Sequence, residues 1–156
     1  MNIRPENPNL AQLVAVAAKL EPMLDQIAFV GGCVTGLLLT DPAAASVRPT
    51  LDVDAIIAIA SYAEFTRLEN HLRELGFHES HAEGAPICRW LNGDLILDLM
   101  PTDASILGFS NRWYGPALEN AQKTRIGDYE IGVITAPYFL ATKLEAFTEE
   151  AETISA

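Results

Sequence analysis

The chain has 156 residues, of which 49 % are hydrophobic and 20 % are charged. These proportions are typical of a globular domain with one hydrophobic core, and they argue against disorder on a large scale. Because 21 acidic residues outnumber 10 basic ones and give a formal net charge of −11, we do not expect a broad basic surface that grips a nucleic-acid backbone.

The two cysteines and the N-terminus bear on the cellular compartment. Cys33 and Cys88 lie in apolar stretches and lack C-x-x-C spacing, which favours reduced thiols over a disulfide framework or a zinc site. The first ten residues lack the charged and then apolar layout of a signal peptide, and no apolar run approaches the roughly 20 residues that cross a bilayer. We therefore expect a cytoplasmic protein with no membrane partner.

The N-terminal third of the chain predicts a helix, a strand and a second helix. Apolar residues recur at helical spacing over 10–20, behind Asn7 or Asn9 as a cap. The short apolar segment 27–32 predicts a strand closed by glycines, and 33–41 predicts a buried helix.

The middle of the chain predicts a loop, a strand and a helix. The loop should cover 42–49, and the strand over 51–60 has the branched residues of a strand buried on both faces. The helix over 61–76 is the most strongly indicated, because Ser61 and Glu64 have the spacing of a capping box.

Two hairpins and a final helix complete the pattern. The segment 87–101 carries Asn92-Gly93 between two apolar runs, and 124–134 repeats this arrangement with its own glycine.

The last predicted helix spans 135–152, and Leu140, Leu144 and Phe147 are expected to face inward with Lys143 beside them. The order of elements predicts an α/β (α+β) fold, in which a small mixed β-sheet is flanked by helices within a single domain.

Two carboxylates begin the predicted strand over 51–60. Residues two apart in a strand point to the same face, so Asp52 and Asp54 should project together. Neighbouring carboxylates repel each other unless a cation lies between them, and hard oxygen ligands of this kind suit Mg²⁺. A bare D-x-D is more often a solvated strand end, so the surrounding sequence has to decide.

Glycines and a third acid provide that context. Gly31 and Gly32 fall between a strand and a helix, where the backbone can approach a phosphate, although such pairs more often serve a tight turn. Asp98 sits inside an apolar strand, where an ionised carboxylate needs a cation, a hydrogen-bond network or the open face of a sheet.

This set of motifs resembles the nucleotidyltransferase fold related to DNA polymerase β. More closely, "VGGCVTGLLL", "RPTLDVDAII", the acid in "LILDLMP" and the late "FLATKLEAF" resemble the AbiEii/AbiGii toxin-type nucleotidyltransferases. The R-x-T-x-D-x-D pattern, in register with the upstream glycines, is the distinctive part.

The resemblance implies a role for each matching residue. Asp52, Asp54 and Asp98 would be the catalytic acids and the ligands of Mg²⁺, with Asp98 also helping to deprotonate the acceptor hydroxyl. The residues implied to contact the nucleotide are Gly31, Gly32, Thr35, Arg48 and Lys143. The implied reaction moves a nucleoside monophosphate from an NTP to a hydroxyl on an RNA 3′ end such as that of tRNA, a protein or a small molecule, and a cognate antitoxin is an implied partner.

Two departures from the family pattern leave a second hypothesis open. Cys33 stands where related transferases often have Ser or Thr, and we expect the family's helical region after the lysine helix to be shortened here. The alternative is therefore a non-catalytic nucleotide-binding or partner-binding member of the same fold. A third interpretation treats the acids as surface residues of an unrelated α/β domain, and carboxylates too far apart to share a metal would favour it.

Other charged and aromatic residues carry weaker signals. Arg48 is expected to contact phosphate or to pair with Asp52 or Asp54, whereas Arg89 is expected to be a solvated surface charge on a strand. The adjacent Trp113 and Tyr114 are more typical of packing over the sheet than of stacking on a base.

Overall fold

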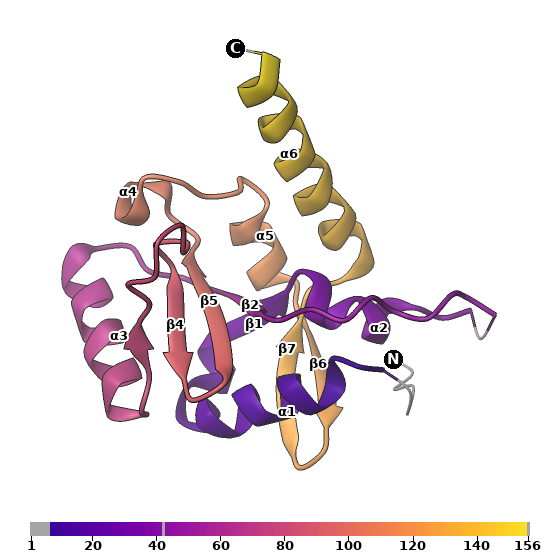
Figure 1. The fold of residues 1–156 in the computed structure, drawn as a ribbon, viewed down its shortest axis with the longest axis horizontal. Helices are drawn as coiled ribbons and strands as arrows, with labels where there is room; N and C mark the ends of the chain where they lie inside the picture. The colour runs from indigo at the N-terminus through magenta and orange to yellow at the C-terminus, as the bar shows by residue number, and fades with distance from the viewer. Residues whose placement is uncertain (1–6, 42, 156) are drawn as a thin grey trace.

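A mixed sheet forms the centre of the computed structural model, which describes residues 7–41 and 43–155. In these residues seven strands pair in the order β3-β4-β5-β2-β1-β7-β6 (Figure 1). The strands are β1 (Ile27–Val30), β2 (Val53–Ile57), β3 (His78–Glu79), β4 (Arg89–Asn92), β5 (Leu95–Pro101), β6 (Gln122–Ile126) and β7 (Tyr129–Val133). Strands and helices alternate along much of the chain, so the predicted fold class is confirmed.

The three central strands combine two pairing directions. β1 runs antiparallel to β2 and parallel to β7, and β2 runs parallel to β5. The register places Asp54 of β2 opposite Asp98 of β5 on one side and opposite Val30 of β1 on the other. Residues opposite each other in a sheet share a face, so pairing alone brings two of the predicted acids together.

Helices of very different length pack on this sheet. They are α1 (Leu10–Lys19), α2 (Thr35–Leu38), α3 (Tyr62–Glu74), α4 (Ala104–Leu107), α5 (Tyr114–Glu119) and α6 (Ala136–Ser155), with 3-10 helices η1 (Glu21–Gln26) and η2 (Gly32–Val34). α3 begins as predicted, because the Ser61 hydroxyl accepts a hydrogen bond from the Glu64 N–H at 3.2 Å. Its residues Leu68 and Leu72 are buried in the core.

The core lies between α1, α3 and one face of the sheet. Its largest fully buried side chains include Leu13 of α1, Leu72 of α3, Phe29 of β1 and Leu97 of β5. The segment 51–60 does contain a strand buried on both faces, but β2 is shorter than predicted and keeps only Val53–Ile57. The buried helix predicted over 33–41 is also shorter, since it starts as η2 and ends at Leu38.

Both predicted hairpins are present, and each has a two-residue Gly-Asp loop. Asn92 pairs with Leu95, so the two-residue loop of the first hairpin is Gly93-Asp94 and not Asn92-Gly93. Gly93 has φ +58°, which suits the glycine-first arrangement of such a loop.

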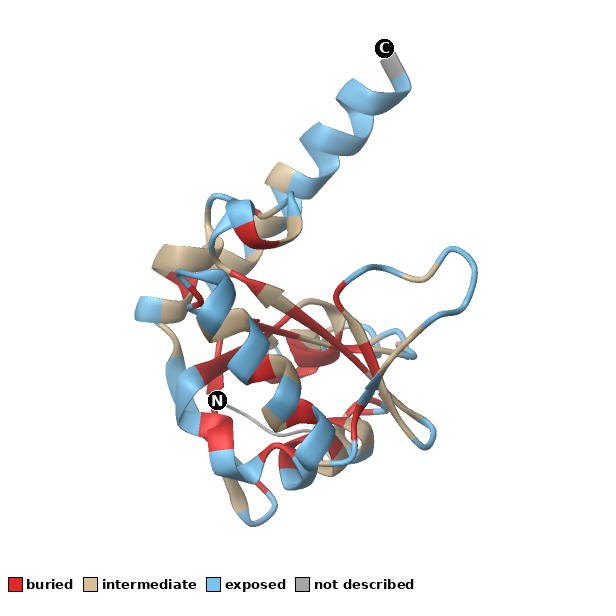
Figure 2. Ribbon diagram, turned by 90° about the vertical axis from the view of Figure 1, so that its left-hand side faces the viewer, coloured by how far each residue is buried: buried red, intermediate tan, exposed pale blue. Residues whose placement is uncertain are grey.

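The prediction for the inner face of α6 is wrong. Leu140, Leu144 and Phe147 are 61 %, 66 % and 69 % exposed, and the helix projects away from the sheet (Figures 1 and 2). The first turns of α6 pack instead through Tyr138 and Phe139, because these side chains lie on the other side of the helix from the exposed stripe. In the described residues no helix combines the length and the hydropathy that a membrane span needs.

Candidate functional site

Three carboxylates meet on one face of the sheet, as the sequence predicts. Asp98 of β5 lies opposite Asp54 of β2, and Asp52 precedes Asp54 by two residues and so shares its face. One ligand oxygen from each of the three lies within 4.8 Å of the others. The carboxylates are therefore close enough to share a metal ion, which disfavours the interpretation of scattered surface acids.

The electrostatics of this acidic cluster (Asp52, Asp54 and Asp98) is unfavourable without a cation. Burial, together with the neighbouring charges of Asp52 and Asp98, raises the pKa of Asp54 to about 8. Burial also raises the pKa of Asp98, against the opposing effect of Arg89. A divalent ion would remove the repulsion, and carboxylate oxygens are the ligands that Mg²⁺ prefers, so the cluster fits such an ion.

The prediction that Arg89 is a solvated surface charge is wrong. Arg89 lies opposite Asp98 in the β4–β5 register, and its Nε and Nη2 donate to Asp98 Oδ1 and Oδ2, each at 2.9 Å. Its Nη2 is also 3.8 Å from Asp52 Oδ2. With a side chain only 25 % exposed, Arg89 is a partner of the acidic cluster and not a solvated surface charge.

The glycines after β1 make room for this cluster. Gly31 has φ +72°, and a Cβ at this position would lie 2.2 Å from Asp54 Oδ2. A Cβ on Gly32 would lie 2.9 Å from the Thr50 methyl carbon. Glycine is needed here because Asp54 and Thr50 occupy the space of a side chain. This packing role exists whether or not the same backbone also contacts a phosphate.

Cys33 is a buried side chain that follows the two glycines. Its Sγ donates to the Val30 carbonyl oxygen at 3.1 Å, and the side chain is buried. Burial raises the pKa of its thiol to about 12, so it is neutral at ordinary pH. The thiol is therefore a small core side chain and offers no contact to an anionic ligand.

Asn9 holds the chain segment that leads into β2. Its amide nitrogen donates to the Arg48 carbonyl oxygen at 3.1 Å, and its Oδ1 accepts from the Thr50 N–H at 2.9 Å. Asn9 occupies the N-cap position of α1, as predicted, but its side chain makes no capping hydrogen bond. The sequence does not predict this second role of Asn9, since a contact with a residue 41 positions away leaves no local signal.

A groove of about 740 Å³ opens beside Asp52, and it brings together most of the residues implied to contact a nucleotide. Residues 44–52 form one wall, and Gly32, Thr35 and Lys143 also line it. The volume is in the range of small-molecule sites. Arg48 lies on this groove and forms no ion pair among the described residues, so its predicted pairing with Asp52 or Asp54 is absent.

Lys143 connects the groove with a smaller pocket of about 180 Å³ over Asp54. This pocket is also lined by Gly31, Met100 and Tyr114. The Tyr114 hydroxyl donates to Met100 Sδ at 3.4 Å, so Tyr114 packs over the sheet, as the sequence favoured. The charge of Lys143 lowers the pKa of Asp54, although burial and the two neighbouring acids outweigh it.

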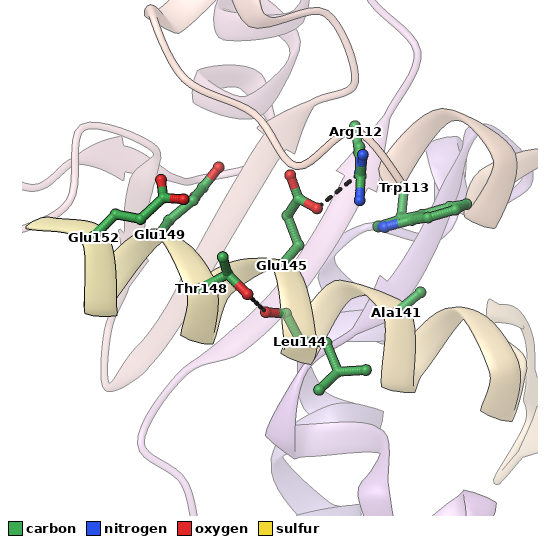
Figure 3. Close-up of a pocket in the computed structure, with 8 residues that line it drawn as sticks. All are labelled: Arg112, Trp113, Ala141, Leu144, Glu145, Thr148, Glu149 and Glu152. Carbon is green, nitrogen blue, oxygen red and sulfur yellow. Dashed lines mark hydrogen bonds and ion pairs between the residues drawn. The ribbon is translucent and has the colours of Figure 1, made fainter.

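A third hollow of about 500 Å³ lies against the outer part of α6 (Figure 3). Arg112 pairs there with Glu145 at 2.8 Å, and Glu149 and Glu152 line the same hollow. Three glutamates would repel a phosphate, so this hollow does not suit an anionic nucleotide.

Comparison with known proteins supports the fold. No protein-family model and no curated protein sequence matches the chain. A solved structure of an antigenic nucleotidyltransferase-like protein from Paracoccidioides brasiliensis is similar, with a TM-score of 0.55 and 19 % sequence identity. The match covers 88 % of this chain and 66 % of that one. At this identity the similarity shows a nucleotidyltransferase-like fold, and it does not extend to the AbiEii/AbiGii family.

Proposed function

We propose that the protein is a Mg²⁺-dependent nucleotidyltransferase that moves a nucleoside monophosphate from an NTP to a hydroxyl acceptor. The observation that carries this proposal is the meeting of Asp52, Asp54 and Asp98 at the edge of a groove, on a nucleotidyltransferase-like fold. A buried acid with a pKa of about 8 is costly to keep ionised, and such groups concentrate at functional sites.

The three acids would hold the metal ion. A bound divalent ion supplies electrostatic stabilisation to the charge that develops on phosphoryl oxygens during transfer. Asp54 and Asp98 stand on β2 and β5, whose mutual pairing fixes their spacing before any ligand arrives, and Asp52 lies immediately before β2. Asp98 is also proposed to accept the proton of the acceptor hydroxyl.

The groove beside Asp52 would take the nucleotide. Arg48 and Lys143 supply positive charge at its wall, and Thr35 supplies a hydroxyl. The backbone at Gly31 and Gly32 would lie against the triphosphate. Hydrogen bonds from Asn9 hold residues 48 and 50 in place, so the groove wall is supported from α1.

The acceptor is proposed to present a single hydroxyl, on a small molecule, a protein side chain or an RNA 3′ end. With a formal net charge of −11 the chain is poorly suited to bind a long polyanion along its surface.

Incubation with labelled NTPs, Mg²⁺ and mixtures of RNA, protein or small acceptors tests the proposal. We expect label transfer that requires Mg²⁺ and that falls at least about 1000-fold in Asp52→Asn. Glu69→Gln on α3 is the matched control, and it should keep the parent activity. The absence of both metal-dependent transfer and Mg²⁺ binding in calorimetry would rule the proposal out.

One observation favours a second candidate, a non-catalytic nucleotide-binding protein of the same fold. Both Asp98 oxygens already accept hydrogen bonds from Arg89, which limits Asp98 as a base. This candidate predicts nucleotide binding that survives Asp98→Asn, with no product from the parent protein. Transfer that is lost in Asp52→Asn excludes it.

A further inference from the structure

The guanidinium of Arg89 occupies the position between two of the three acids. Its Nη2 is 2.9 Å from Asp98 Oδ2 and 3.8 Å from Asp52 Oδ2. Its Nε donates a hydrogen bond to the other Asp98 oxygen, Oδ1, at 2.9 Å. A cation that bridges Asp52 and Asp98 would need the same place. The Asp98 side chain is 8 % exposed, so water competes little for these contacts.

The charges lead to the same conclusion. In the fully ionised state that would hold a metal ion, the three carboxylates carry −3, and Arg89 already offsets one of these charges and leaves −2 for the ion. Arg89 comes from β4, and its position opposite Asp98 is fixed by strand pairing. Its guanidinium is therefore held at the cluster by the backbone as well as by its two hydrogen bonds.

We infer that Arg89 is an internal competitor of the divalent cation, which stabilises the metal-free cluster and weakens metal binding at Asp98. The inference rests on the proposed metal site. A bound metal ion must either share Asp98 with the permanently charged Arg89 guanidinium or displace that guanidinium from Asp98. Either arrangement makes the free energy of metal binding less favourable. Arg89 is thus a positioning residue that sets the cation affinity of the site.

A purely structural role for Arg89 makes the opposite prediction. If Arg89 only fixed the Asp98 side chain for the metal, its removal would loosen a ligand and weaken binding. If it competes with the metal, removal strengthens binding even while it destabilises the metal-free protein. The sign of the change in affinity separates the two roles.

Calorimetric titration of the EDTA-treated protein with Mn²⁺, and separately with Mg²⁺, tests the inference. We expect Arg89→Met to bind Mn²⁺ about tenfold more tightly than the parent, a difference of about 1.4 kcal/mol. Arg89→Lys keeps the charge but not the two-pronged contact, and it should remain within about threefold of the parent. Arg73→Met is the matched control, because Arg73 pairs with Glu69 and Glu79 away from the cluster, and it should leave the affinity unchanged.

Each outcome has a distinct meaning. Equal or weaker Mn²⁺ binding by Arg89→Met overturns the competition while leaving the metal site intact. Absence of binding by every variant, the parent included, overturns the proposed metal site as well. If Arg89→Met does not fold without metal, Arg89→Gln replaces it, and the recovery of its folded circular dichroism signal on adding Mn²⁺ replaces the calorimetric titration. The inference is overturned if this recovery needs a Mn²⁺ concentration equal to or higher than the one that saturates the parent.

Discussion

An arginine with acidic partners lies on each face of strand β4, Arg89 of β4 itself on one face and Arg73 of α3 on the other, and the two differ in what surrounds them. On one face Arg89 binds Asp98 and approaches Asp52. On the other face Trp90 is buried, and the Arg73 guanidinium of α3 lies 5.6 Å above its ring. Arg73 also pairs with Glu69 and Glu79. Each arginine thus has two acidic partners, but only Arg89 belongs to a cluster with a third carboxylate.

Exposure makes the two clusters electrostatically different. Arg73 is 45 % exposed, and its hydrogen bond lowers the pKa of Glu79 even though burial acts in the other direction. Around Arg89 burial prevails, so the pKa of Asp98 is raised in spite of two hydrogen bonds from the guanidinium. Arg73 therefore stabilises ionised Glu79, although burial and the charge of Glu79 still raise the pKa of Glu69. The Arg89 pair leaves repulsion among three carboxylates for a further cation to relieve.

The largest expected effect tests how tightly the acidic cluster is enclosed. Gly31→Ala should destabilise the protein by about 3 kcal/mol, because its Cβ would meet Asp54 Oδ2 at 2.2 Å and its φ is +72°. Gly84→Ala is the control with a similar φ of +77° and open space around it, and it should cost about 1 kcal/mol. Urea unfolding measures both values. Equal losses would show that Asp54 moves aside without cost.

The second effect compares the two arginines directly. In EDTA at pH 7, Arg89→Met should lower the free energy of unfolding by about 2 kcal/mol, since it leaves buried carboxylates without their counter-charge. A protonated Asp98 needs no counter-charge, and its pKa is raised. The loss in free energy of unfolding caused by Arg89→Met should therefore be smaller at pH 5.5. Arg73→Met should cost under about 1 kcal/mol, as expected for an exposed pair. Similar losses in urea unfolding for the two variants would remove the distinction between the clusters.

The third effect is a difference in pH dependence between Asp54 and Glu79. The folded pKa of Asp54 is about 8, above its ordinary value of 3.8, because of burial and then Asp52 and Asp98. Its contribution to stability is therefore complete below pH 4 and is lost as the pH rises through 8. Glu79 has a lowered pKa, so its contribution is present above its ordinary value of 4.5 and is lost as the pH falls below it.

Thermal unfolding in EDTA at pH 5.5 and pH 8.5 measures this difference. Asp54→Asn should raise Tm by a few degrees, about 2–4 °C for each kcal/mol gained, and the gain should be larger at pH 8.5. Glu79→Gln should not raise Tm at either pH. A gain from Asp54→Asn that is equal at the two pH values would contradict the raised pKa.

The smallest effect concerns Glu69, which belongs to the surface cluster of Arg73, Glu69 and Glu79. Glu69→Gln should change the free energy of unfolding by less than about 0.5 kcal/mol, since Glu69 lies 3.6 Å from an exposed Arg73. Chemical denaturation measures it. A loss above 1 kcal/mol would indicate that the surface cluster acts as a coupled network.

Much of the site was predictable because its signals are local. The alternation of strand side chains places Asp52 and Asp54 together, and an acid inside an apolar strand marks Asp98 as unusual. The capping box at Ser61 likewise depends on residues three apart, and the helix begins there as predicted. Assigning these acids to a metal ion and to catalysis is still a proposal.

What the sequence by itself determined is the fold class, the main helices and strands apart from β3, α4 and α5, and the closeness of Asp52 and Asp54, since these follow from periodicities of two and 3.6 residues. Only the tertiary structure decided that Arg89 faces Asp98 and that Asn9 holds the segment before β2. Only packing decided that Leu140, Leu144 and Phe147 of α6 face outward. Such contacts depend on strand register and on which face of a helix meets the core, and neither is encoded by spacing alone.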